Sequence, residues 1–100
     1  MEVRHDDDEL ARIEADHNYR GKLDAERVRS FRKVMNLIRN VQNETELYQW
    51  RGGHFEKLEP PRSHQRSLRT NKQWRLIVEI ENRPGPDNNI CVIKSIEDYH

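Results

Sequence analysis

The residues at the end of the sequence are of types that perform acid–base chemistry. Asp98, Tyr99 and His100 directly follow residues 90–96, an apolar run that is typical of a buried strand. RNA is cut by its own 2′-hydroxyl group when a base takes its proton, an acid protonates the leaving 5′-oxygen and cations stabilise the charge on the phosphate. Histidine exchanges a proton near neutral pH, and a tyrosine ring can stack on an unpaired base. The three residues are therefore a candidate group for RNA cleavage, and a solvated polar tail is the competing interpretation.

A second set of candidate residues is basic and lies around a predicted β-hairpin with its turn at Asn71-Lys72. The basic side chains of this segment are Arg62, His64, Arg66, Arg69, Lys72 and Arg75. A guanidinium group presents a planar fork of donors that matches two phosphate oxygens. Because side chains alternate along a strand, Arg69 is expected on the opposite face from Arg66. We predict that Arg62, Arg66, Arg69 and Lys72 bind RNA, against the alternative of a solvated sheet face.

The distribution of charge supports an anionic partner more than the total does. The chain has 18 basic and 18 acidic residues, so its formal net charge is zero. Residues 1–28 carry 5 basic and 9 acidic side chains, residues 29–78 carry 11 and 4, and residues 79–100 carry 2 and 5. The middle of the chain is thus strongly basic, which fits an anionic partner such as nucleic acid and equally fits a chance clustering of charge in a short chain.

Composition excludes several classes of protein. A chain of 100 residues forms one domain, here residues 1–100, and its single cysteine, Cys91, excludes an internal disulfide and is expected to be a small buried apolar residue. No apolar stretch has the length of a membrane span, and no signal peptide begins the sequence, so we expect a cytoplasmic protein that does not contact a membrane. The spacing of cysteine and histidine does not match a metal site, and no nucleotide-binding glycine motif is present, so we expect neither a metal nor a cofactor.

Periodicity predicts an α+β fold. Helices are expected from Asp6 to about Tyr19 and from about 25 to 42, the second with Asp24 as N-cap, followed by a single turn at 44–49 capped by Asn43. Strands are expected at 1–5, 54–59, 65–70, 73–81 and 90–96, with a surface loop at 83–88. The two amphipathic helices must then cover one face of a small, twisted, mostly antiparallel sheet and leave the other face free.

Several segments combine into a recognisable pattern. They are Phe31-Arg32-Lys33, Phe55-Glu56-Lys57-Leu58, Arg62, Gln65-Arg66-Ser67-Leu68-Arg69, Asn71, Gln73-Trp74-Arg75-Leu76-Ile77 and Ile96-Glu97-Asp98-Tyr99-His100. In this order and spacing, over about residues 19–100, the pattern resembles the HigB-type killer toxins (plasmid maintenance killers) of the RelE/ParE toxin superfamily.

The resemblance implies a fold and an activity. The fold would be the RelE-like, microbial RNase-like one. The activity would be that of a toxin of a type II toxin–antitoxin system, a ribosome-dependent endoribonuclease (mRNA interferase) that cleaves translated mRNA in the ribosomal A site. The resemblance also implies a cognate HigA-like antitoxin with a helix-turn-helix domain. Through this antitoxin the chain would contact operator DNA indirectly.

The resemblance also assigns roles. Carried over by position, Arg75 would contact the phosphate or the transition state, and Asp98, Tyr99 and His100 would be the catalytic ending. The sequence departs from the family at two places. Glu56-Lys57 stands where some members have a His-Pro pair before the leucine, and Glu59-Pro60-Pro61-Arg62 stands where Lys-Gly-Asp-Arg is common. His54 or His64 is then the candidate for the missing base.

Two other functions fit the same fold. A ParE-like toxin would inhibit gyrase by protein binding without nuclease activity, and the Asp-Tyr-His ending argues against it. A non-toxic homologue would act only with its antitoxin in autoregulation, which the Pro60-Pro61 departure allows. For antitoxin docking we expect an exposed basic helix face that carries Arg29, Arg32, Lys33 and Arg39.

Overall fold

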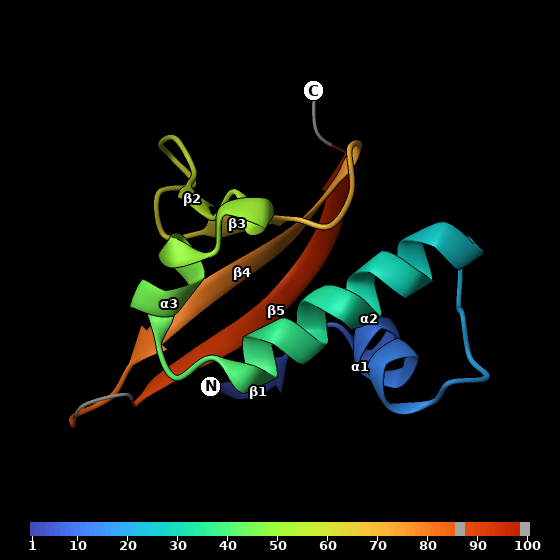
Figure 1. Cartoon of the computed structure of the whole chain (residues 1–100), viewed down its shortest axis with the longest axis horizontal. Helices are drawn as coiled ribbons and strands as arrows, with labels where there is room; N and C mark the ends of the chain where they lie inside the picture. Colours follow the sequence, from blue (N-terminus) through green and yellow to red (C-terminus); the bar gives the residue numbers. More distant parts are fainter. Residues whose placement is uncertain (86–87, 99–100) are drawn as a thin grey trace.

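A five-stranded sheet forms the centre of the part of the chain that the computed structural model describes, residues 1–85 and 88–98 (Figure 1). The strands are β1 (Glu2–His5), β2 (Glu56–Lys57), β3 (Arg66–Arg69), β4 (Trp74–Asn82) and β5 (Asn89–Asp98). Their order is β1-β5-β4-β3-β2, with β1 parallel to β5 and every other neighbouring pair antiparallel. The predicted, mostly antiparallel sheet is thus confirmed, and the apolar strand β5 lies inside it.

The second and third helices begin at the residues that local sequence signals indicated, and the first begins two residues later than predicted. They are α1 (Asp8–Ala15), α2 (Ala25–Asn40) and α3 (Glu44–Gln49), followed by the short 3-10 turn η1 (Arg51–Gly53). Asp24 caps α2 by accepting the Arg27 N–H at 2.8 Å, and Asn43 caps α3 by accepting the Glu46 N–H at 3.2 Å. Both caps satisfy a donor that the first helical turn leaves without a partner.

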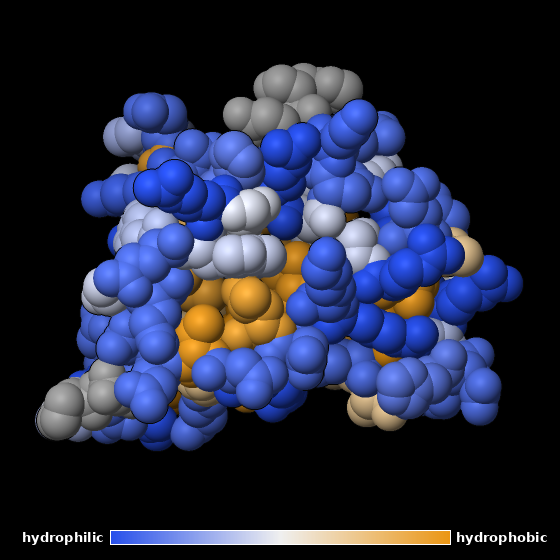
Figure 2. Space-filling view, viewed as in Figure 1, coloured by the Kyte–Doolittle hydropathy of each residue, from blue (hydrophilic) through white to orange (hydrophobic). Residues whose placement is uncertain are grey.

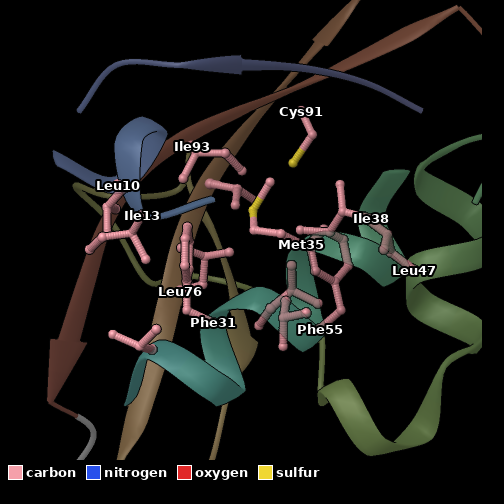
Figure 3. Packing of buried hydrophobic residues seen from close by; sticks show 14 residues of the cluster. Leu10, Ile13, Phe31, Met35, Ile38, Leu47, Phe55, Leu76, Cys91 and Ile93 are labelled. Carbon is pink, nitrogen blue, oxygen red and sulfur yellow. The ribbon is translucent and has the colours of Figure 1, made fainter. Parts of the chain in front are cut away.

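The hydrophobic core lies between the helices and one face of the sheet (Figures 1 and 3). Alternation along β4 sends Leu76 and Val78 into this core, while Arg75 and Ile77 point to the other face. Among the fully enclosed side chains are Ile13 of α1, Phe31, Met35 and Ile38 of α2, Leu47 of α3, and Leu68 and Ile93 of the sheet. This is the expected α+β arrangement, with all three helices contributing to one core.

The first helix is shorter than predicted, and a side chain from α2 accounts for its end. α1 stops at Ala15 rather than near Tyr19. The Arg32 guanidinium donates to the carbonyl oxygens of Ile13 at 2.9 Å, Asp16 at 2.9 Å and Tyr19 at 3.1 Å. A cation at this position satisfies carbonyls that the helix leaves without a partner. Arg32 is therefore half-buried between the helices, and the expectation that it lies on an exposed docking face was wrong.

The strand predicted at 54–59 is reduced to Glu56–Lys57. Leu58 still donates its N–H to the Gln65 carbonyl at 3.1 Å, but Pro60 and Pro61 have no N–H to continue the ladder. The chain therefore leaves the sheet edge here.

Candidate functional site

A basic pocket lies beside the hairpin that joins β3 to β4. It has a volume of about 190 Å³ and is lined by His54, Arg69, Asn71, Lys72 and Arg75. Four of these side chains are basic types and the fifth is an amide, and none of the described lining residues is acidic. A small cavity with this lining is suited to an anion such as a phosphate group.

The hairpin register brings the two arginines of the pocket together. Arg69 of β3 lies directly opposite Arg75 of β4, and Ser67 lies opposite Ile77. All four point away from the core, since Leu68 and Leu76 alternate with them and pack beneath the helices. Arg69 and Arg75 thus share the face of the sheet that the helices do not cover, as predicted. That face is not free, however, since Ser67, Arg75 and Ile77 on it are only 2%, 6% and 3% exposed.

Among the residues that the structure describes, three groups hydrogen-bond to Nη2 of Arg75. Its side chain is only 7% exposed. Nη2 donates to Ser67 Oγ at 3.0 Å, to the His54 carbonyl at 3.1 Å and to Glu56 Oε1 at 2.8 Å. The guanidinium therefore fixes the wall of the pocket while it presents positive charge to the cavity.

His54 contacts Arg69 across the pocket. The Arg69 Nη1 atom lies 3.4 Å from His54 Nε2. Because a guanidinium only donates hydrogen bonds, Nε2 is the acceptor in this contact. His54 has a left-handed backbone, with φ of 45°, and the Arg75 guanidinium holds its carbonyl. The structure thus places one of the two candidate histidines in the pocket.

Asn71 shapes the turn that carries Lys72. Its Oδ1 atom accepts hydrogen bonds from the N–H groups of Gln73 and Trp74, each at 2.9 Å. Such a side-chain-to-backbone contact is the usual way in which asparagine fixes a tight turn. Asn71 was recognisable from the sequence as a turn residue and as part of the family pattern, but not as part of the pocket lining.

Glu56 is a second residue of the site that was not predicted from the sequence. Its carboxylate is half-exposed and lies 2.8 Å from Arg75 Nη2, at the edge of the pocket. The sequence had indicated this position only as one where a family histidine is absent. A carboxylate here supplies a proton acceptor next to the cations, so the site holds two candidate bases, Glu56 and His54.

A larger hollow adjoins the pocket and shares Asn71 and Lys72 with it. Its volume is about 440 Å³, and the rest of its lining is Asp24, Glu26, Arg27, Gln73 and Trp74. The Arg27 guanidinium lies over the Trp74 ring, 4.4 Å from its centre. This stacked pair gives the hollow a flat cationic wall of the kind that nucleobases contact.

Asp98 lies at the same end of the sheet but on the other face from Arg75. It is paired with Trp74 in the β4–β5 register, whereas Arg75 is paired with Glu97. The Gln73 Nε2 atom donates to Asp98 Oδ2 at 3.4 Å, which links Asp98 to the larger hollow. Tyr99 and His100, the other two residues predicted for the catalytic ending, lie outside the described residues.

Three of the predicted RNA-binding or basic residues do not line the pocket. Arg62 donates to both oxygens of Glu97, at 2.9 and 2.7 Å, and this hydrogen bonding lowers the pKa of the Glu97 carboxyl. Arg66 faces the helix side of the sheet and pairs with Glu44 at 3.3 Å. His64 lies 3.9 Å from Glu79 Oε2, further along the face that the helices do not cover. The structure therefore groups His54, Arg69, Lys72 and Arg75 and leaves these three outside.

Within residues 1–85 and 88–98, no group of three or more His, Cys, Asp or Glu side chains is arranged to hold a metal ion. Over the same residues, none of the helices combines the length and the apolar character that crossing a membrane requires.

Comparisons with known proteins bear on the family and the fold of the chain. The family model of HigB-like toxins, described as RelE-like toxins of the type II toxin–antitoxin system HigB, matches residues 3–100. Among solved structures, a YoeB/ParE toxin from Agrobacterium tumefaciens is similar, with a TM-score of 0.60, 17% sequence identity and full coverage of both chains. At that identity the likeness concerns the fold alone. The comparison with curated protein sequences found no match.

Proposed function

Because the chain belongs to the HigB-like family of RelE-like type II toxins, we propose that it is a ribosome-dependent endoribonuclease that cleaves translated mRNA in the A site. The observation that carries the proposal is the basic pocket, in which Arg69, Lys72 and Arg75 converge beside His54. Cleavage by the 2′-hydroxyl group places extra negative charge on the phosphate, and preorganised cations stabilise that charge most effectively in a partly enclosed site.

Each pocket residue has a proposed part in the reaction. Arg75 is held rigidly and would bind a phosphate oxygen without a cost for ordering its side chain. Arg69 and Lys72 would stabilise the charge on the second oxygen and on the neighbouring phosphate. His54 would accept the 2′-hydroxyl proton through Nε2, and the ending Asp98–His100 would supply the acid.

The adjoining hollow would hold the mRNA base next to the cut. The Arg27–Trp74 stack offers a flat surface, and Asn71 and Gln73 offer amide groups at its edge. Base stacking of this kind positions a single-stranded nucleotide without requiring one particular sequence.

The proposal also covers the partners and the place of action. Type II toxins are neutralised by a protein antitoxin, so family membership implies that partner. We propose that it is a HigA-like protein with a helix-turn-helix domain, which would bring the toxin to operator DNA indirectly. Action on translating ribosomes would place the chain in the cytoplasm.

The decisive experiment is single-turnover cleavage of an mRNA on programmed ribosomes. The wild-type chain should cut within the A-site codon, and Arg69→Gln should cut about 100-fold more slowly. Arg83→Gln is the matched control, because Arg83 is a half-exposed arginine that pairs with Glu2 beyond the far end of β4. Growth arrest on expression without new mRNA 5′ ends would overturn the nuclease proposal and favour a protein-binding toxin.

A further inference from the structure

A second hollow on the helix side of the molecule does not belong to the proposed RNA site. Its volume is about 310 Å³, and its lining is Lys33, Val34 and Leu37 of α2, Trp50 and Gly52 of the α3–η1 segment, and Arg69 and Thr70 at the end of β3. We call this hollow the α2 groove. Figure 2 shows a hydrophobic surface on this face of the molecule, in the region that α2, α3 and β3 surround in Figure 1.

The apolar floor of the α2 groove is built by side chains that the core does not fully enclose. Leu37 and Trp50 are partly buried and pack against the core from outside. The Trp50 ring lies against the backbone of Gly52 and Gly53, where an added Cβ would come within 3.2 and 2.4 Å of the ring. The glycine pair therefore lets the tryptophan lie flat and form one wall of the groove.

The rim of the α2 groove is cationic. Lys33 and Arg69 line it, and none of its described lining residues carries a negative charge. An apolar floor with cations at the rim fits an amphipathic segment whose apolar side chains are flanked by Asp or Glu. A helix bound in such a groove places its anchors three or four residues apart.

We propose that the α2 groove is the docking site of an acidic amphipathic segment of the antitoxin. The inference rests on the toxin function, which supplies the partner: a type II toxin must be bound by a protein. Leu37 and Trp50 would receive the apolar anchors, and Lys33 and Arg69 would pair with flanking carboxylates.

Arg69 gives this docking a direct consequence for the RNA site. The same side chain lines both the α2 groove and the basic pocket. A carboxylate that pairs with Arg69 from the groove side withdraws one of the cations from the scissile phosphate. The antitoxin then neutralises the toxin without a residue of its own in the pocket.

The floor of the groove argues against RNA as its occupant. The rim cations Lys33 and Arg69 can bind phosphates, but the apolar floor between them matches apolar side chains rather than a charged backbone. RNA and a second copy of this chain are distinguishable outcomes of the test.

The test measures the affinity of the purified chain for the antitoxin, the product of the gene beside its own. Leu37→Asp puts a carboxylate into the floor and should weaken binding about 100-fold, and Lys33→Glu should weaken it about 10-fold. Arg29→Glu is the matched control, because Arg29 is an exposed cation one turn earlier on α2 that does not line the groove. Lys33 is exposed, so its substitution tests the site even if Leu37→Asp unfolds the chain.

Three results would overturn the proposal. The first is an affinity of both variants within twofold of wild type. The second is weaker binding of a single-stranded RNA 12-mer by Lys33→Glu with unchanged antitoxin affinity, which would assign the groove to RNA. The third is a wild-type dimer that Lys33→Glu converts to a monomer, with antitoxin affinity unchanged. Affinity is measured without RNA cleavage, so failure of the nuclease proposal would appear separately, as a wild-type chain that does not cut mRNA.

Discussion

Arg69 and Arg75 lie directly opposite each other across the β3–β4 hairpin, and both side chains line one pocket. Two like charges in opposed positions of an antiparallel pair destabilise a sheet. This unfavourable pairing indicates that Arg69 and Arg75 serve binding rather than stability. Substitutions at these positions are therefore expected to affect cleavage and the free energy of unfolding differently.

Replacing Arg69 should reduce cleavage but not stability. Arg69→Gln removes the like-charge repulsion, so the free energy of unfolding should stay the same or rise by about 0.5 kcal/mol. Cleavage on programmed ribosomes should fall about 100-fold, because a cation at the phosphate is lost. Urea unfolding and single-turnover cleavage measure the two effects. A folded Arg69→Gln variant with wild-type cleavage would show that this arginine does not act in the reaction.

Replacing Arg75 should reduce both the cleavage rate and the stability of the fold. Arg75→Met leaves the Ser67 hydroxyl and the His54 carbonyl without the guanidinium that they contact in a nearly enclosed place. We expect the free energy of unfolding to fall by about 2–3 kcal/mol. Ser67→Ala is the control, and it should cost about 1 kcal/mol because it removes only one acceptor of the same guanidinium. An Arg75→Met variant as stable as wild type in urea would contradict this account.

Local signals in the sequence predicted much of the fold, and long-range contacts produced the differences. Asp24 and Asn43 were identifiable as caps because a cap depends on residues two or three positions away. The early end of α1 depends on Arg32, which is 19 residues from Ile13 in the sequence. Periodicity places Arg32 on the polar side of its helix and contains no information about the carbonyls that it meets there.

In the candidate site, too, local patterns were predictable from the sequence and long-range contacts were not. Strand alternation was enough to place Arg69 and Arg75 on one face of the hairpin. It was not enough to bring His54 and Glu56 to them, since both come from the irregular segment before β3. Arg62 is also an arginine and is close to Arg69 in the sequence, but its guanidinium pairs with Glu97 of β5. No local pattern indicates that contact.

Acid should weaken the fold through Glu14. Arg39 donates to its carboxylate at 2.6 and 2.8 Å, and these hydrogen bonds lower the pKa of Glu14 despite its burial. A carboxyl whose pKa is lower in the folded chain stabilises the fold above its unfolded pKa, about 4.3, and this contribution is lost as the pH falls through the folded value. Glu14→Gln should therefore lower the free energy of unfolding by about 1 kcal/mol at pH 7, and by much less at pH 3.

Urea unfolding at the two pH values measures this difference. Glu81→Gln is the control, because the Glu81–Arg4 pair is exposed and screened by water and salt. An equal loss of stability at pH 7 and pH 3 for Glu14→Gln would contradict the assignment.

The thiol of Cys91 should not react in the folded chain. Cys91 is fully enclosed in the core between β1 and β4, and burial raises its pKa to about 12. Because the thiolate is the reactive form, labelling with a disulfide reagent at pH 8 should proceed no faster than the chain unfolds. Addition of urea should accelerate labelling in proportion to the unfolded fraction. Rapid, complete labelling of the native chain without urea would show that the thiol is accessible.

The histidine that follows the strand β5 by two residues gives the sharpest test of the catalytic assignment. His100→Gln removes the group that we propose as proton donor but retains a hydrogen-bonding side chain of similar length. The change lies beyond Asp98, where β5 ends, so the free energy of unfolding should change by less than about 0.5 kcal/mol. Single-turnover cleavage on ribosomes should fall by about two to four orders of magnitude, the usual contribution of a proton-transfer group. His54→Gln should have an effect of the same order if His54 is the base, and the two variants should each remove a different limb of the pH–rate profile. Wild-type cleavage by His100→Gln would show that the Asp-Tyr-His ending is a polar tail, and the proton donor would then have to be sought among the residues of the pocket.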